Sequence, residues 1–142
     1  MRPEKKNDRE SWTVIVETAF TILLLFTFLF AIMEAGRLFN VQQTLTDAAR
    51  EGARLGVTPL TQTNTLPNST DITNAVTVFL SAAAITGASV NVNNGNCPAP
   101  ANFTKVCVTA PYQLISLSMF NLQGFTVKGK ALMRNETSQT IP

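Results

Sequence analysis

The hydrophobic residues of this chain are concentrated in one uninterrupted run near its N-terminus. Between Glu17 and Glu34 the sequence TAFTILLLFTFLFAIM carries no charge. A bilayer core about 30 Å thick needs about 20 residues of helix, so we expect the flanks to contribute and predict a transmembrane helix over residues 12–39. A cleaved secretory signal is the alternative. It is disfavoured because the run is longer than a typical signal core and no A-x-A-like cleavage site follows it.

Beyond Glu34 the apolar residues fall on one helical face instead of filling every position. They recur at alternating steps of three and four, at Leu38, Val41, Leu45, Ala48, Gly52 and Leu55. The helix is therefore predicted to continue outside the membrane over residues 40–56, until Gly56 and the Thr58-Pro59 pair end it. Oppositely charged residues three apart, Glu34–Arg37, Asp47–Arg50 and Glu51–Arg54, indicate a solvated helical face.

The remaining pattern predicts a small domain over residues 57–136, followed by a loose tail at 137–142. A second helix is expected with Ser69, Thr70 or Asp71 as its N-cap and Gly87 at its end, and its apolar face comprises Ile72, Val76, Phe79, Leu80 and Ala83. Alternating segments SVNVN, KVCVTA and FTVKGKALM predict three strands. Between the last two, PYQLISLSMFNLQG is predicted to be a crossing segment that is partly helical or touches the membrane. The predicted fold class is α+β: a long N-terminal transmembrane helix that extends into a domain of one helix and about three antiparallel strands.

The charges predict the orientation of the chain. Residues 1–11 form a basic leader with Arg2, Lys5, Lys6 and Arg9 directly ahead of the apolar run. By the positive-inside tendency the leader stays in the cytoplasm and the C-terminal domain lies outside. The net charge is only +2 and the sequence shows no clustered basic stretch beyond this leader, so no nucleic-acid partner is expected.

The two cysteines, Cys97 and Cys107, both fall in the part predicted to lie outside. An oxidising compartment favours a disulfide between them, and closing so short a loop stabilises the fold by about 2–3 kcal/mol in the chain-entropy model. Two free thiols are the alternative. A metal site is not expected, because two cysteines without histidine or clustered carboxylates do not complete a tetrahedral site.

Residues suited to catalysis are sparse. The chain has no histidine, and it shows no glycine-rich phosphate loop, nucleophile elbow or paired-carboxylate motif. We therefore expect no enzyme activity, no catalytic residue, no cofactor and no small-molecule substrate. Sequons at Asn68, Asn102 and Asn135 matter only if the source organism glycosylates asparagine.

The two glutamates that bound the apolar run have different expected roles. A carboxylate within the hydrocarbon is costly unless paired, so an intramembrane glutamate is a functional hypothesis by default. Glu17 is expected to pair with a neighbouring helix and set the axial register; the alternative is a carboxylate that snorkels to the headgroups. Glu34 is expected in a solvated or interfacial turn together with Arg37.

Several of these motifs occur together in one known family. The valine-glutamate pair Val16-Glu17, then Glu34, Gly36-Arg37 and Phe39, and finally the AAREGAR stretch at residues 48–54 resemble the N-terminus of the TadE-like family of the tight-adherence pilus system. The later segments KVCVTAPY and KALMRNE are similar to the last two strands of that family.

The resemblance implies a type IV pilin-like subunit that assembles through its N-terminal helix. It would sit in the inner membrane with other copies, other pilin-like subunits and the assembly platform as partners. Glu17, Glu34 and Arg37 would serve assembly and register, and Leu38, Val41 and Leu45 would carry subunit contacts. Two alternatives remain: a permanent inner-membrane scaffold of the same apparatus, and a membrane-anchored adhesin-like binding module.

Processing is a separate implication of the resemblance. In such systems a peptidase cleaves after a glycine five residues before the glutamate, a position that Trp12 occupies here. After cleavage Glu17 would pair with the new amine of Thr13 in a neighbouring subunit. Without cleavage its partner would be Arg9 or Lys6 of a neighbour.

Overall fold

The structure, a computed structural model, describes residues 6–59, 65–114 and 124–135, with side chains from residue 11 onward. Over these ranges the elements are α1 (Lys6–Val57), α2 (Ser69–Ala82), β1 (Ser89–Val92), β2 (Phe103–Tyr112) and β3 (Phe125–Arg134). The chain divides into two compact units, Met1–Gly36 and Arg37–Pro142, and the boundary between them falls inside α1.

Helix α1 continues past the apolar run as the period of three and four predicts. It ends at Val57, one residue beyond the predicted Gly56. Thr58 closes the last turn, because its backbone N–H donates to the Leu55 carbonyl and its hydroxyl donates to the Arg54 carbonyl. Pro59 then stops the helix, since proline has no N–H and disfavours the helical conformation in the residue before it.

The three strands form one antiparallel sheet in the order β1-β2-β3. Strand β2 is central: it pairs with β3 along its whole length, from Phe103 opposite Arg134 to Tyr112 opposite Phe125. The shorter β1 pairs with it from Ser89 opposite Thr109 to Val92 opposite Val106. With helices on one face of an antiparallel sheet, the α+β prediction is confirmed.

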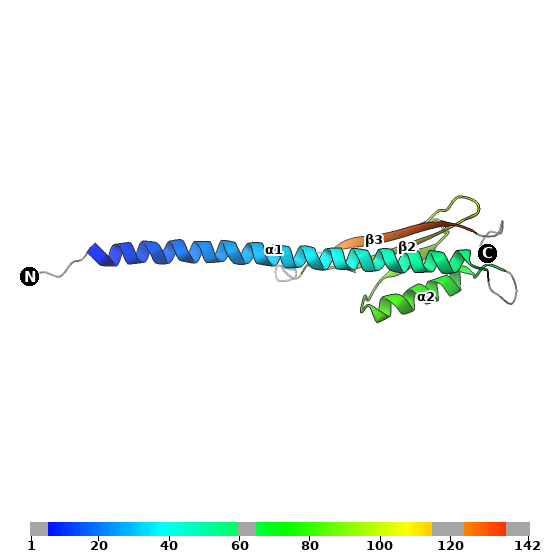
Figure 1. The fold of residues 1–142 in the computed structure, drawn as a ribbon, viewed down its shortest axis with the longest axis horizontal. Coiled ribbons are helices and arrows are strands. Elements are labelled where there is room, and N and C mark those ends of the chain that lie inside the picture. Colours follow the sequence, from blue (N-terminus) through cyan, green and yellow to red (C-terminus); the bar gives the residue numbers. More distant parts are fainter. Residues whose placement is uncertain (1–5, 60–64, 115–123, 136–142) are drawn as a thin grey trace, which may run out of the picture. The chain divides into compact units, whose positions relative to one another are not determined.

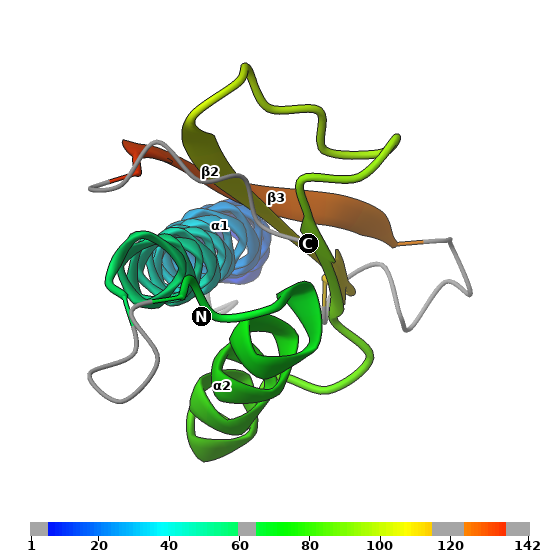
Figure 2. The same cartoon turned by 90° about the vertical axis from the view of Figure 1, so that its right-hand side faces the viewer.

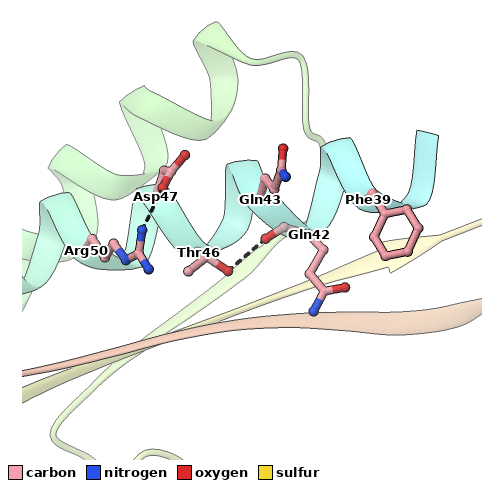
Figure 3. Close-up of a pocket in the computed structure, with 6 residues that line it drawn as sticks. All are labelled: Phe39, Gln42, Gln43, Thr46, Asp47 and Arg50. Atoms are coloured by element: carbon pink, nitrogen blue, oxygen red, sulfur yellow. Dashed lines mark hydrogen bonds and ion pairs between the residues drawn. The ribbon is translucent and has the colours of Figure 1, made fainter. Parts of the chain in front are cut away.

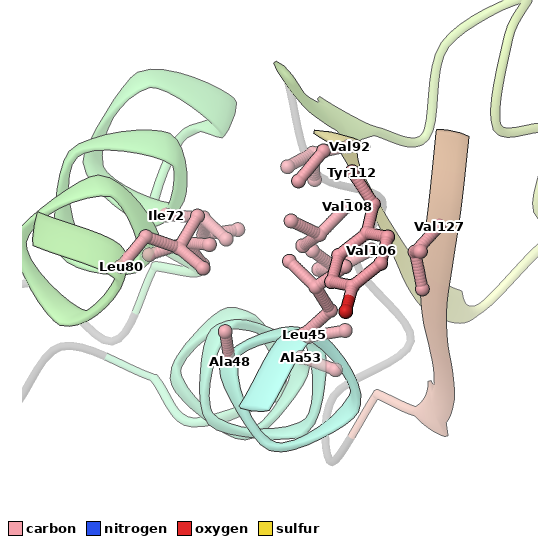
Figure 4. Close-up of a cluster of buried hydrophobic side chains, with 13 residues drawn as sticks. Leu45, Ala48, Ala53, Ile72, Leu80, Val92, Val106, Val108, Tyr112 and Val127 are labelled. Carbon is pink, nitrogen blue, oxygen red and sulfur yellow. The ribbon is translucent and has the colours of Figure 1, made fainter. Parts of the chain in front are cut away.

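In the C-terminal unit, residues 37–57 of α1 and the helix α2 both cover the same face of the sheet, here called the inner face (Figures 1 and 2). Alternation along the strands sends one set of side chains to this face. Leu45 of α1, Ile72 of α2 and Val106 of β2 meet between the two helices and the sheet (Figure 4). The opposite, outer face of the sheet remains uncovered by either helix.

Two glycines allow α1 to approach its neighbours closely. A Cβ added at Gly129 of β3 would collide with the backbone of Leu45 and Thr46 in α1. A Cβ at Gly52 of α1 would collide with the Val76 side chain of α2. Hydrogen side chains at these two positions therefore set the spacing of the layers.

The start of α2 differs from the prediction. Asn68 is the N-cap, in extended backbone conformation, and its side-chain oxygen accepts a 2.8 Å hydrogen bond from the Asp71 backbone N–H. Ser69, Thr70 and Asp71 were expected to cap, but all three lie within the helix. The capping geometry explains the shift, because the N-cap side chain must reach the amide three residues later.

The end of α2 also differs. Gly87 was expected to close the helix, but the helix ends at Ala82 and Ala84 takes the left-handed conformation, with φ 56°. Hydrogen bonds from Ala84 N–H to Ser81 and from Ile85 N–H to Leu80 close the last turn, the pattern of a Schellman motif. Ile72, Val76 and Leu80 of the predicted apolar face are buried, whereas Phe79 and Ala83 are exposed.

The predicted disulfide is confirmed. Cys97 and Cys107 are bonded, with their Cα atoms 5.9 Å apart, and both side chains are buried. The bond attaches the loop after β1 to the centre of β2. The predicted crossing segment falls mostly on residues 115–123, which lie outside the described residues, as does the tail at 137–142.

Candidate assembly surfaces

The N-terminal part of α1 exposes apolar side chains in every direction. Every side chain from Ser11 to Met33 is exposed, including Trp12, Leu23 and Phe30. The most apolar stretch of this segment is long enough to cross a membrane, and none of it is buried within the chain. A helix that is apolar all round requires lipid or other helices around it. By length and composition, this segment is therefore a candidate membrane span.

Glu17 is the charged residue inside this apolar segment. Its side chain is exposed, and the structure gives the carboxylate no ion pair within the residues it describes. The hydrogen bond at this position belongs to the backbone, whose carbonyl accepts from the Thr21 hydroxyl at 2.9 Å. The carboxylate is thus free to meet a group outside the chain.

Glu34 was expected in a solvated or interfacial turn, and this expectation is wrong. Its exposed fraction is 8%, which makes it a buried carboxylate. Glu34 precedes Leu38 by four residues, so the two lie on the same face of α1. A solvated face lies on the other side of α1.

Arg37 lies close to the end of the sheet. Its guanidinium carbon is 5.7 Å from the centre of the Tyr112 ring, and that ring is 5.4 Å from the ring of Phe125. A cation over an aromatic face contributes about 0.5–1 kcal/mol at a partly exposed site. Arg37 therefore has a structural contact within the C-terminal unit, and its assembly role remains a prediction.

The predicted packing residues Leu38, Val41 and Leu45 pack within the chain itself. Leu45 is fully buried in the core, so the expectation that it contacts a neighbouring subunit is wrong. Its face of the helix is occupied by the chain's own sheet. Leu38 and Val41 pack against the same core but are only half-buried, and their subunit contacts remain a prediction.

The AAREGAR stretch, residues 48–54, divides into two sets with different surroundings. Its small residues, Ala48, Ala49, Gly52 and Ala53, are buried against α2 and the sheet. Its charged residues point to solvent, where Arg50 pairs with Asp47 at 3.4 Å and Arg54 pairs with Glu51 at 3.6 Å. All four charged groups are well exposed, so these pairs add little stability. The small residues explain the stretch as a packing motif.

The solvent side of α1 carries a shallow hollow in the C-terminal unit (Figure 3). Its lining runs along one helix, from the exposed ring of Phe39 through Gln42, Gln43 and Thr46 to the Asp47–Arg50 pair. One of the three charged pairs that predicted a solvated face, Asp47–Arg50, lies on this surface. Its mixture of one apolar ring, amides and a compensated ion pair is suited to contact with protein rather than to catalysis.

The three sequons have different surroundings. The amide of Asn68 is engaged as the cap of α2, and Asn135 is buried with its side-chain oxygen accepting from the Thr104 hydroxyl at 2.7 Å. Asn102 lies exposed in the turn before β2, with φ 61°. Asn68 and Asn102 are thus exposed, and Asn135 is the buried one of the three.

The sequence did not reveal the cationic outer face of the sheet. Lys105 of β2 and Lys128, Lys130 and Arg134 of β3 all project to this face. They are far apart in the sequence, yet the even spacing of Lys128, Lys130 and Arg134 places them on one side of a strand. That spacing, together with the pairing of β2 and β3, is the signal that identifies the face.

Comparison with known proteins supports the N-terminal motif. A family model described as TadE-like protein matches residues 13–54, which contain Glu17, Glu34, Arg37 and the AAREGAR stretch. The resemblance is therefore confirmed over this segment. No curated protein and no solved structure matches the chain.

Proposed function

Because residues 13–54 carry the TadE-like segment, we propose that the protein is a pilin-like structural subunit of a tight-adherence pilus or a related type IV apparatus. The family match supports the coarser statement, a role in the tight-adherence pilus. The observation that carries the finer proposal is an exposed carboxylate, Glu17, within a helix whose apolar side chains are also exposed on every side.

Packing such a helix among copies of itself removes its apolar surface from water. The same burial would make the carboxylate costly unless a cation accompanies it. Assembly in register is the arrangement that meets both requirements, because it brings a cationic group of one subunit to Glu17 of the next. That group is the amine of Thr13 after cleavage, or Arg9 or Lys6 without cleavage.

The C-terminal unit then serves as the part exposed outside the helical core. Its own helix segment is already packed against its sheet through Leu45 and Gly52. It therefore needs no neighbour to complete its core, and its outer surfaces are available for contacts between subunits or with the surroundings.

A permanent scaffold of the same apparatus is the second candidate, and one observation favours it. Trp12 occupies the position at which the pilin peptidase requires glycine. An uncleaved chain would keep its basic leader in the cytoplasm and remain in the inner membrane. The two candidates share a topology and differ in whether the subunit enters a filament.

The test is the Glu17→Gln variant, which removes the charge and keeps the shape of the side chain. Thr21→Ala is the matched control, because it changes a polar group one turn away on the same helix face without altering charge. We expect E17Q to reach the membrane at the wild-type level while its recovery in sheared filaments falls at least tenfold, and T21A to behave as wild type. Unchanged recovery of E17Q would show that the carboxylate does not set the register.

A further inference from the structure

The described strands place several positive charges on the outer face of the sheet. Lys128 and Lys130 of β3 are exposed and stand opposite Thr109 and Cys107 of β2. Residues two apart on a strand are about 6.8 Å apart along it, so the two ammonium groups repel each other. Their placement on one face is not explained by stability of the fold.

Among the residues that the structure describes, no acid lies on this face to offset these charges. The three strands contain no Asp or Glu at all. In the part of the C-terminal unit that the structure describes, the carboxylates are on the helices: Asp47 and Glu51 pair with arginines of α1, and Asp71 is in the first turn of α2. Both helices cover the inner face, so the outer face keeps its positive potential.

The face is also hollowed. A depression of about 450 Å³ is bounded on one side by the disulfide-closed loop, including Asn96 and Pro98, and on the other by Lys128 and Lys130. Lys105 fixes the loop to the sheet, because its ammonium donates to the Pro98 carbonyl at 3.1 Å. The Cys97–Cys107 bond fixes it a second time. The wall of the depression is thus held in place before any ligand binds.

Uncharged hydrogen-bonding groups line the rest of the depression. The Asn91 amide and the Thr109 hydroxyl each lie 3.3 Å from the Ser89 hydroxyl. These groups form a polar strip across β1 and β2, next to the lysines of β3. A ligand that matches this surface has negative charges at one side and hydroxyl groups at the other.

We propose that this face binds an acidic polysaccharide, with sugar carboxylates on Lys128 and Lys130 and sugar hydroxyls on Ser89, Asn91 and Thr109. The proposal goes beyond the assembly role and holds whether or not the chain enters a filament. A nucleic acid fits less well, because the aromatic residue on this face of the described strands, Phe103, is half-buried and not free to stack bases. A lipid surface fits less well because Leu132 is the single large apolar side chain exposed there among the described strand residues.

The experiment uses the full chain in detergent micelles and a surface coated with polygalacturonate. The test variant is Lys128→Gln/Lys130→Gln. The matched control is Arg50→Gln/Arg54→Gln, which removes the same charge from exposed positions of α1. All variants keep the basic leader, so its contribution to binding cancels in the comparison.

We expect wild-type protein to bind at low salt and to weaken as salt is added, because exposed charge pairs are screened. The lysine variant should bind about tenfold more weakly and the arginine variant within about twofold of wild type. Fully methyl-esterified polygalacturonate should not bind. An equal loss in both variants, or equal binding to the esterified polymer, would overturn the proposal. Duplex DNA or phosphatidylglycerol vesicles that bind more tightly and depend on the same lysines would also overturn it, by identifying another partner.

Discussion

The two parts of α1 are one helix with opposite requirements. From Ser11 to Met33 every side chain is exposed and most are apolar. From Arg37 to Val57 the apolar side chains other than Phe39 lie on one face and are buried or half-buried there. Leu23 is 65% exposed and Leu45 is fully buried. The apolar side chains of the second part are buried by the rest of the same chain. Those of the first part can be buried only by lipid or by other molecules.

The acidic residues show the same difference. Asp47 and Glu51 in the second part each have an arginine three residues later. Glu17 in the first part has no ion-pair partner in the described portion of the chain, although it lies inside an apolar segment, where an unpaired charge is costly once water is excluded. One part of the helix therefore completes a domain, and the other part leaves its apolar surface and its carboxylate to partners outside the chain, as the proposed assembly role requires.

The largest expected difference between the two parts of α1 is in the effect of truncating one leucine in each. Leu45→Ala should lower the free energy of unfolding of the C-terminal unit by about 3.5 kcal/mol, because it opens a cavity in the core. Leu23→Ala should leave that unfolding unchanged. Urea unfolding of the full chain in micelles, followed by pulse proteolysis, measures both. Equal effects of the two substitutions would show that the parts are not independent.

Two glycines, Gly36 and Gly129, should respond in opposite ways to substitution by alanine. Gly129→Ala should destabilise the C-terminal unit by about 3 kcal/mol, because its Cβ meets the backbone of Leu45 and Thr46, which cannot move aside locally. Gly36→Ala has open space around its Cβ and should stabilise α1 by about 0.5–1 kcal/mol through helix propensity. The same unfolding assay applies. A neutral Gly129→Ala would mean that the strand and α1 are farther apart than described.

Removing the disulfide should affect only the C-terminal unit. The double variant Cys97→Ser/Cys107→Ser is expected to lose about 2.5 kcal/mol of stability, since the unfolded chain regains the entropy of a short loop. Trp12, the single tryptophan of the chain, lies in the other part, and its fluorescence in micelles should not change. A shift of that fluorescence on reduction would contradict the separation of the two parts.

The smallest expected effect is at the start of α2. Asn68→Ala removes the side-chain acceptor for the Asp71 N–H and should cost about 1 kcal/mol. Asn74→Ala, at an exposed position inside the same helix, is the control and should be neutral or slightly stabilising. Thermal unfolding of both variants in micelles checks the difference. If the two variants had the same melting temperature, Asn68 would not be the cap.

Much of the fold was predictable because the spacing of apolar residues changes along the sequence wherever the burial of the segment changes. The full apolar run, the steps of three and four after Glu34, and the alternation in the strands each reflect one type of burial. The disulfide was predictable because two cysteines allow one pairing. The cap of α2 was displaced by one residue, since adjacent polar residues offer equivalent hydrogen-bonding groups and only the backbone conformation selects Asn68.

The surface properties were harder to predict because they depend on which strands become neighbours. Lys105 and Lys128 are far apart in the sequence, and only the pairing of β2 with β3 places them on one face. Glu34 was misjudged because its charge suggested solvent, while its position one turn before Leu38 places it on the buried side. Its pairing with Arg37 in sequence concealed that placement.

Whether the exposed part of α1 serves assembly can be tested by locating the protein in cells and determining its N-terminal residue. Sheared filaments and membranes from the same cells would be analysed by mass spectrometry of the N-terminal peptide. If α1 serves assembly, we expect to recover the chain in the filament fraction, and its N-terminal residue there identifies the cation that meets Glu17. Recovery in the membrane fraction alone, with the basic leader intact, would contradict the account and establish the protein as a membrane scaffold.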